Sequence, residues 1–356
     1  GAMQVAQRGT SSTTNGWGSL DRWKPGWGGQ DEAITHAQHA LTSSDTGPWA
    51  KGFRNSLHLT NGNQTSGAGA ADYLEILYTV EAQDLANSGW EYTSTSSNIT
   101  ISFWAQASVA QTYYVYLQSL DGTAQLYAFS FALSANTWTK VTKTIPGAAN
   151  VAFDNNNGGG LRIGIVPFYG TNYTTSGFTL NTWAAQTGSN MMPDMTSTWW
   201  TTNDATFEIT GVQLEVGDTA TEFEHKSYSN ELLRCRRYYE NTYPLGYYPG
   251  HNFNEEYTFG TSKPVCLNFV ASDDTVTAIS YPFSTTKRAN PTVTVYNANT
   301  GASGTAHTYK GTGTTNGAVA LNIIQTNPNH ALLGTSLGAV NQASEMYFHY
   351  QADAEL

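Results

Sequence analysis

Charged side chains are scarce in this chain of 356 residues, since Asp, Glu, Lys and Arg together make up only 12% of it. The abundance of Thr, Asn, Ser and Gly favours strands and tight turns over long surface helices. The few charges are mostly acidic, with 16 Lys plus Arg against 27 Asp plus Glu. The resulting net charge of −11 repels the phosphate groups of nucleic acids and of anionic lipids. We therefore expect neither a nucleic acid nor an anionic membrane surface as a partner.

Cysteine and long apolar runs are also in short supply. The two cysteines, Cys235 and Cys266, cannot form the disulfide framework of a small secreted scaffold, and their spacing matches no metal-site motif. We expect two thiols rather than a bond between them. No run of 18 or more apolar residues is present, so we expect no membrane insertion. Gly1-Ala2-Met3 resembles an expression scar and is excluded from fold reasoning, so a longer natural chain is expected.

Known catalytic motifs are missing as well. The sequence contains no GxSxG, no HExxH and no phosphate-binding loop ending in Lys-Ser or Lys-Thr. A glycosidase needs two carboxyl groups roughly 5–10 Å apart. Glu75, Glu208 and Glu215 are the candidates on strands, but a polar residue in an alternating strand usually lies on the solvated face. His36 and His39 would share a zinc ion only on a helix, and a solvated pair is the simpler interpretation. We expect no catalysis and no required cofactor.

What the sequence does contain is a series of short segments in which apolar and polar residues alternate. Repeated period-two patterning separated by turn sequences such as DNNNGGG is typical of a sandwich or jelly roll. Eight such segments are SLHLT, DYLEILYTV, ITISFWAQAS, TYYVYLQSL, QLYAFSFAL, WTKVTKTI, LRIGIVPFY and TFEITGVQLEV.

The stretch NELLRCRRYYE breaks this alternation and predicts one short helix with Ser229 as its N-cap. Five or six further strand-like segments follow it. The prediction is an all-β chain with an N-terminal jelly-roll β-sandwich, a short connecting helix and a small C-terminal β-sandwich. The expected boundaries are the scar at 1–3, the jelly roll at 4–228, the helical connector at 229–242 and the C-terminal domain at 243–356.

The segment from Thr206 to Glu240 resembles a signature of tail-fibre and receptor-binding proteins of tailed bacteriophages. The matching elements are GVQLEVG at 211–217, ATEFE at 220–224 and ELLRCRRYY at 231–239. The resemblance implies a non-catalytic virion protein of a tail or fibre, acting outside the cell. It also implies a jelly roll similar to carbohydrate-binding modules, with a bacterial cell-surface polysaccharide as partner.

The predicted helix carries several large apolar side chains. A helix this short is marginal without tertiary partners, so we expect a homotrimer with the helix near the threefold axis. The side chains expected to be exposed for this contact are Leu232, Leu233, Tyr238 and Tyr239.

Aromatic residues in loop-like contexts are the candidates for sugar binding, because a flat ring face stacks on sugar C–H groups. Neighbours on an extended chain point to opposite sides, so at least one ring of Trp199-Trp200 should be exposed. The alternative for each tryptophan is that it fills an end of the sandwich or lies in a trimer interface. Trp104 and Trp138 alternate with apolar strand residues and are expected in the core. The candidate sugar-binding residues are Trp23, Trp27, Trp183, Trp199 and Trp200, with Asn203 and Asp204 as polar partners.

A structural Ca²⁺ is common in jelly-roll carbohydrate modules and needs six to eight oxygen ligands rather than a motif. Asp21, Asp204 and Glu208 are the candidate ligands. Two other functions stay open. One is a pair of carbohydrate-binding modules from a polysaccharide-degrading enzyme, and the other is a purely structural virion protein. Binding to a glycan array would separate an adhesin from a structural part.

Overall fold

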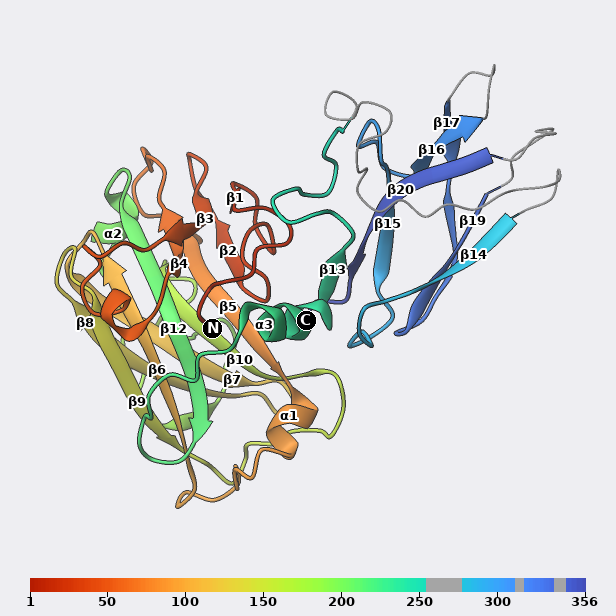
Figure 1. Cartoon of the computed structure of the whole chain (residues 1–356). Coiled ribbons are helices and arrows are strands. Elements are labelled where there is room, and N and C mark those ends of the chain that lie inside the picture. Colours follow the sequence, from red (N-terminus) through yellow and green to blue (C-terminus); the bar gives the residue numbers. More distant parts are fainter. Residues whose placement is uncertain (254–276, 311–316, 336–343) are drawn as a thin grey trace. The chain divides into compact units, whose positions relative to one another are not determined.

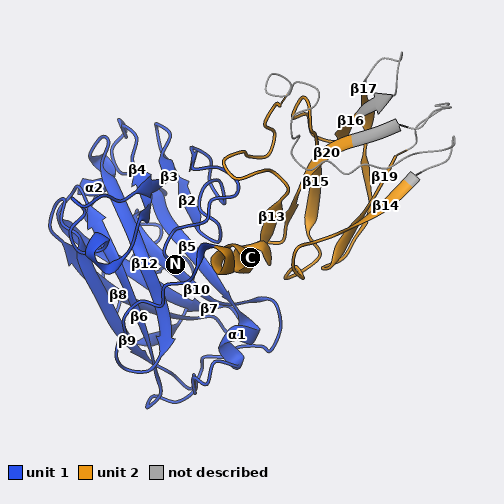
Figure 2. Cartoon of the chain, viewed as in Figure 1, with its two compact units in different colours: residues 1–228, 356 blue, residues 229–355 orange. Residues whose placement is uncertain are grey.

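The computed structural model describes residues 1–253, 277–310, 317–335 and 344–356. Within these residues the chain is all-β, with antiparallel sheets and few helices, as the sequence predicted (Figure 1). It divides into two compact units (Figure 2). Unit 1 is Gly1–Tyr228 with Leu356, and unit 2 is Ser229–Glu355. None of the described helices is both long enough and apolar enough to cross a membrane.

Unit 1 contains two six-stranded antiparallel sheets. Sheet A has the strand order β1-β3-β4-β12-β6-β9, and sheet B has the order β11-β8-β7-β10-β5-β2. The strands of sheet A are β1 Ser11–Ser12, β3 Thr35–Ala40, β4 Asn55–Thr60, β6 Asn98–Ala107, β9 Thr139–Pro146 and β12 Thr206–Val216. Those of sheet B are β2 Lys24–Gly28, β5 Tyr73–Glu81, β7 Gln111–Ser119, β8 Gln125–Leu133, β10 Gly159–Tyr169 and β11 Trp183–Ala185.

All eight segments predicted as strands in this unit are strands. Four more strands were not predicted, namely β1, β2, β3 and β11. Three short helices complete the unit: the 3-10 helix η1 at Trp49–Lys51, α1 at Ala82–Ala86 and α2 at Thr198–Thr201.

The core of unit 1 lies between the two sheets and follows the alternation along each strand. On β12, Phe207 and Ile209 are fully buried in it, and on β6 so are Phe103 and Ala105. Successive side chains of a strand point to opposite faces of a sheet. The residues between these, such as Glu208, therefore lie on the other face of sheet A.

The GVQLEVG segment forms the second half of β12 and begins at an irregularity. The register between β12 and β6 shifts between Thr210 and Gln213. Gly211 has a φ of 64°, and a Cβ there would lie 2.5 Å from the ring of Phe53. A bulge with a left-handed backbone and an aromatic ring against it needs glycine.

The ATEFE turn is tied to the same half of β12 by side-chain hydrogen bonds. Thr221 donates to Glu215 from both its backbone nitrogen and its hydroxyl, each at 2.7 Å. The backbone nitrogen of Glu224 donates to Gln213 at 2.9 Å. Phe223 packs edge-on against Phe53, with 4.8 Å between ring centroids. The polar residues of the signature thus hold the chain in place where unit 1 ends.

Residues 1–3, which the sequence predicts to be a scar outside the fold, are packed into unit 1. The backbone of Gly1 exchanges hydrogen bonds with that of Val212, and Met3 is buried in the core. These three residues therefore take part in the fold.

In its described residues, unit 2 contains two sheets around a core of its own, as expected of a small β-sandwich. One sheet has the order β13-β20-β16-β17, with β15 also paired to β20, and the other has the order β14-β19-β18. Its elements are α3 Tyr228–Arg236, β13 Tyr239–Asn241, β14 Thr277–Pro282, β15 Thr292–Asn297, β16 Thr305–Lys310, β17 Gly317–Ala320, β18 Asn322–Thr326, β19 His330–Thr335 and β20 Ser344–Asp353. The core takes residues from both sheets, including Leu333 and Tyr350.

The predicted helix is α3, but not all of the large side chains that were expected to be exposed on it and just after it are exposed. Leu233 is 51% exposed, whereas Tyr238 and Tyr239 are buried. Tyr239 opens β13 and its hydroxyl donates to Gln351 at 2.9 Å, so β-pairing within unit 2 accounts for its burial. Cys235 is buried in α3, and Cys266 lies outside the described residues.

Helix α2 buries both of its tryptophans in the core of unit 1. The ring of Trp200 stacks on that of Phe168 at 5.3 Å, and its Nε1 donates to the carbonyl of Gly67 at 3.2 Å. We predict that Trp200→Ala lowers the free energy of unfolding of unit 1 by about 3–5 kcal/mol, because it leaves a large cavity. Urea denaturation measures this, with the half-buried surface residue Trp17→Ala as the control. Equal stability of the two variants would contradict the burial.

Unit 2 should lose stability in mild acid because of His349. This residue is fully buried on β20 against the ring of Tyr243, and burial lowers its pKa from 6.5 to about 4. Since the folded state disfavours the charged form, stability is complete above pH 6.5 and falls as the pH drops toward 4, by up to about 3 kcal/mol. Urea unfolding at several pH values should show a shallower fall for His349→Phe. Parallel curves for the two proteins would refute this origin.

Candidate functional site

Four of the tryptophans predicted to bind sugar lie in the interior. Trp199 and Trp200 have no exposed surface, and Trp23 and Trp27 are only 4% and 3% exposed. The expectation that one ring of the Trp199-Trp200 pair is exposed is wrong, because α2 directs both into the core, where each indole nitrogen bonds a backbone carbonyl. Trp27 lies on β2, opposite Leu74 of β5. Buried rings offer a sugar no face to stack on.

The remaining predicted sugar-binding residues are distributed over separate places. Trp183 is half-buried at the edge of sheet B, where it packs on Tyr127 and donates to the carbonyl of Pro146 at 2.7 Å. Asn203 and Asp204 are exposed, and the amide of Asn203 donates to the Asp204 carboxylate at 3.1 Å. The rings next to them in the sequence are buried, so no aromatic partner from α2 joins them.

The three candidate calcium ligands are not brought together. Asp21 is buried, where burial raises its pKa, and it accepts a hydrogen bond from the backbone nitrogen of Gln7 at 2.9 Å. Asp204 is an exposed turn residue with a φ of 55°. Among the described residues, the ligand atoms of Glu208 come close to those of two histidines instead.

Part of the outer face of sheet B is covered by the chain itself. Tyr116 and Tyr169 lie there under the segment that carries Met191 and Met192, and all four are buried. The hydroxyl of Tyr116 donates to Glu75 at 2.8 Å, and that of Tyr169 donates to the same carboxylate. The exposed remainder of this face, at Thr112, Ser130 and Ala132, carries small side chains.

The outer face of sheet A carries polar groups and tryptophans side by side, and we call it the polar face. Along one line across the strands, Gln106 pairs with Glu208, Glu208 with His58, and His58 with Ala37. Along the next line, Trp104 pairs with Lys140 and with Thr210, and Ser56 pairs with His39. The residues of the polar face are therefore His39, Ser56, His58, Trp104, Gln106, Lys140, Glu208 and Thr210.

One end of the polar face is aromatic. Trp104, Trp138 and Trp49 are partly buried and pack around a small apolar cluster that contains Leu41 and Phe53. The indole nitrogen of Trp138 donates to Asp45 at 3.2 Å. Trp104 and Trp138 were expected in the core between the sheets, but both pack against the separate cluster with Leu41 and Phe53. On β6, Phe103 and Ala105 occupy the core side, so Trp104 faces away from it.

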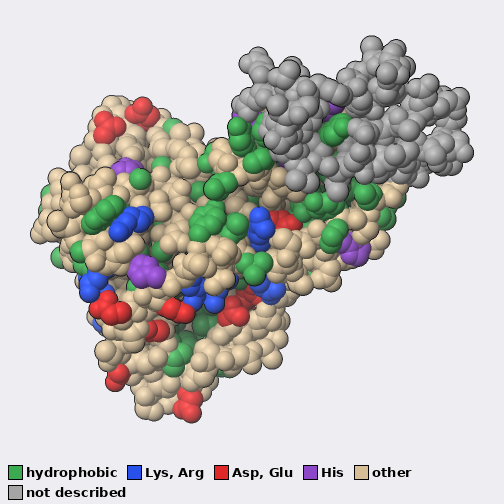
Figure 3. All heavy atoms as spheres, in the orientation of Figure 1, with side chains coloured by type: hydrophobic (Ala, Val, Ile, Leu, Met, Phe, Trp, Pro, Cys, Tyr) green, Lys and Arg blue, Asp and Glu red, His purple; other side chains and the backbone are tan. Residues whose placement is uncertain are grey.

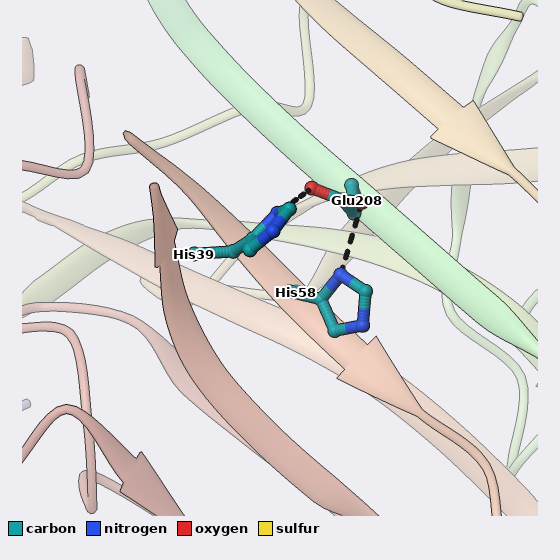
Figure 4. Close-up of side chains that lie close together, drawn as sticks. All are labelled: His39, His58 and Glu208. Atoms are coloured by element: carbon teal, nitrogen blue, oxygen red, sulfur yellow. Dashed lines mark hydrogen bonds and ion pairs between the residues drawn. The ribbon is translucent and has the colours of Figure 1, made fainter. Parts of the chain in front are cut away.

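The centre of the polar face is a carboxylate between two imidazoles (Figure 4). The Nδ1 atom of His39 lies 3.0 Å from Glu208 Oε2, and that of His58 lies 2.9 Å from Oε1. The Ser56 hydroxyl donates to Oε2 at 2.6 Å. Burial alone would raise the pKa of Glu208, but the contacts with His58, Ser56 and His39 outweigh it and hold the pKa below its usual value. The carboxylate is therefore ionised and its direction is fixed.

The viewed surface of unit 1 carries few charged side chains, as the low content of charged residues in the sequence predicts (Figure 3). Figure 3 shows mostly uncharged polar surface on the viewed face of this unit, with small separate groups of acidic and basic side chains and no broad basic patch. Such a surface suits neutral polar ligands better than phosphate backbones.

Sequence reasoning found Glu208 but neither His58 nor the role of His39. The sequence predicts His36 and His39 as a solvated pair, which is wrong for His36. On β3 they point to opposite faces, and His36 is buried against Ser19, whose hydroxyl lies 2.6 Å from its Nδ1 atom. The alternation in SLHLT and TFEIT does place His58 and Glu208 on polar faces. This alternation does not show which strands are neighbours in the sheet.

No protein-family model matches the chain, and no curated protein matches it. Among solved structures, the enzymatically active domain of tailspike protein 4 from bacteriophage CBA120 aligns with 11% identity and a TM-score of 0.31, covering 55% of this chain and 19% of that one. This chain thus spans about a fifth of that tailspike structure.

Two further solved structures align over most of their own length. The N-terminal cellulose-binding domain of Cellulomonas fimi β-1,4-glucanase C has 13% identity and a TM-score of 0.28, with 61% of this chain and 99% of that one covered. A putative sugar binding protein from Bacteroides thetaiotaomicron has 11% identity and a TM-score of 0.30, with 60% and 96% covered. Scores and identities this low do not establish a shared function.

Proposed function

We propose that this chain is a receptor-binding or fibre protein of a tailed bacterial virus that attaches to a host surface glycan without cleaving it. The phage signature at 206–240 supports the viral part of the proposal. The polar face of sheet A supports the glycan part, because it combines partly exposed tryptophans with amide, hydroxyl and carboxylate groups.

The observation that carries the glycan proposal is that Trp138 and Gln106 lie at the same end of sheet A. Thr139, the first residue of β9, pairs with Ala105, so Trp138 and Gln106 lie at the same end of the sheet. An aromatic ring stacks on sugar C–H groups while an amide both donates to and accepts from sugar hydroxyls. Asp45, which holds the indole of Trp138, supplies a further acceptor.

The absence of cleavage is part of the proposal. The carboxylates considered for catalysis have structural partners instead. Glu208 is held by Ser56, and Glu215 by Thr221 in the ATEFE turn. Glu75 accepts two tyrosine hydroxyls on the covered part of the outer face of sheet B. A general acid and base for glycoside hydrolysis need access to the sugar bond between them.

The proposed glycan binding can be tested directly. On an array of purified bacterial surface polysaccharides, we expect binding in the high-micromolar to millimolar range, or about 4–6 kcal/mol per site. Trp138→Ala should weaken it roughly tenfold, because stacking contributes about 1 kcal/mol beyond the buried area. Gln106→Ala should weaken it as well, through lost hydrogen bonds.

The matched control is Trp183→Ala, which removes a half-buried tryptophan at the edge of the other sheet. It should leave binding unchanged. Loss of binding in this control but not in Trp138→Ala would move the site to sheet B. Release of oligosaccharides from any bound polysaccharide would contradict the non-catalytic part, and no binding to any polysaccharide would favour a purely structural virion protein.

Assembly is a separate part of the proposal. We propose a homotrimer with α3 near the threefold axis, in which weak single sites act together. Leu233 supports this, since an apolar side chain that is 51% exposed on a short helix gains from a partner. Light scattering at micromolar concentration should give the mass of three chains, and Leu233→Glu should reduce it to one. A monomeric wild-type protein would refute the trimer.

A further inference from the structure

Three side chains from neighbouring strands bring metal-binding atoms together on the polar face. His39 on β3, His58 on β4 and Glu208 on β12 place one ligand atom each within 4.8 Å of the others. Among the described residues no other group of three His, Cys, Asp or Glu side chains does so. We propose that these three residues bind one transition-metal ion of the Zn²⁺ type, a site that does not depend on the proposed glycan function.

The donor set selects the class of ion. Two imidazole nitrogens and one carboxylate are the ligands of open zinc sites, in which water or another ligand takes the fourth position. Ca²⁺ and Mg²⁺ prefer oxygen ligands only. The side chain of His39 is 48% exposed, whereas that of Glu208 is 9% exposed. The fourth position would therefore face solvent on the His39 side.

The separations are close to those that a bound ion requires. With bonds of about 2.1 Å, two ligands of a tetrahedral zinc ion lie roughly 3.4 Å apart. The observed separations from the Glu208 oxygens are 3.0 Å for His39 Nδ1 and 2.9 Å for His58 Nδ1. The two distances end on different oxygens of the carboxylate, and the three ligand atoms lie within 4.8 Å of one another. One side chain therefore has to shift for all three to reach the same ion, and the half-exposed ring of His39 is the one beside solvent.

The position of His58 Nδ1 suits the same ion. This buried atom lies 2.9 Å from Glu208 Oε1, with which it forms an ion pair when the imidazole is protonated. A metal ion bound between the nitrogen and the carboxylate would take the place of that proton.

The surrounding groups orient the ligands as outer-shell residues of metal sites do. The Nε2 atom of His58 lies 3.1 Å from the hydroxyl of Thr60, which leaves Nδ1 for the ion. The hydroxyl of Ser56 donates to Glu208 Oε2 at 2.6 Å and fixes the carboxylate. Each of these partners comes from β4, the strand between the other two.

Isothermal titration of the full chain, freed of metal by a chelator and carrying no histidine tag, tests the proposal. With ZnCl₂ we expect one ion per chain with micromolar or tighter affinity, and no binding of CaCl₂ at the same concentrations. His39→Ala and Glu208→Gln should each weaken zinc binding at least tenfold. The control His225→Ala removes an exposed histidine of the same unit outside the group and should bind as the wild type does.

Circular dichroism checks that each variant is folded. If Glu208→Gln does not fold, His39→Ala decides alone, because its half-exposed ring can be removed without opening the core. Failure of the wild-type chain to bind zinc overturns the proposal. So does zinc binding that persists unchanged in folded His39→Ala, which would place the ion elsewhere.

Discussion

The alternation of side chains along β12 is the constraint on which unit 1 depends. This strand lies between β4 and β6 in sheet A, and its Phe207 and Ile209 are fully buried between the sheets. The same alternation forces Glu208 onto the opposite face, where water is largely excluded. A buried carboxylate is costly unless it is paired and hydrogen-bonded. The neighbouring strand β4 therefore has to supply partners, and it does so through Ser56 and His58.

The phage-like signature has a structural explanation in this chain. Gly211 allows a bulge against Phe53, and Gln213 and Glu215 bind the turn that follows. These contacts end the sandwich in a defined way before α3 begins. The signature thus informs us about architecture, and the ligand has to be inferred from the polar face instead.

The sequence predicted the all-β class and eight strands of unit 1, because their alternation is strong and local. It missed β2 and β3, whose residues KPGWG and THAQHA contain glycine, proline or alanine where large apolar residues are expected. It also misplaced Trp199 and Trp200, since nothing local shows that α2 closes over the core. The cluster at Glu208 joins β12 to β3 and β4, whose histidines lie 150 residues or more earlier in the chain. Glu208, for example, pairs with His58. Only tertiary pairing could reveal it.

The tryptophans of unit 1 differ in burial, and their burial decides which of them can contact a ligand. A ring with no exposed surface, such as that of Trp200, gives the core its bulk and cannot also stack on a ligand. Trp104 and Trp138 are packed less completely, because they lie on the face of sheet A that no second sheet covers. On sheet B part of the corresponding face is closed by Met192 and its neighbours. The polar face of sheet A keeps an ionised carboxylate, an amide and partly buried tryptophans together on one face.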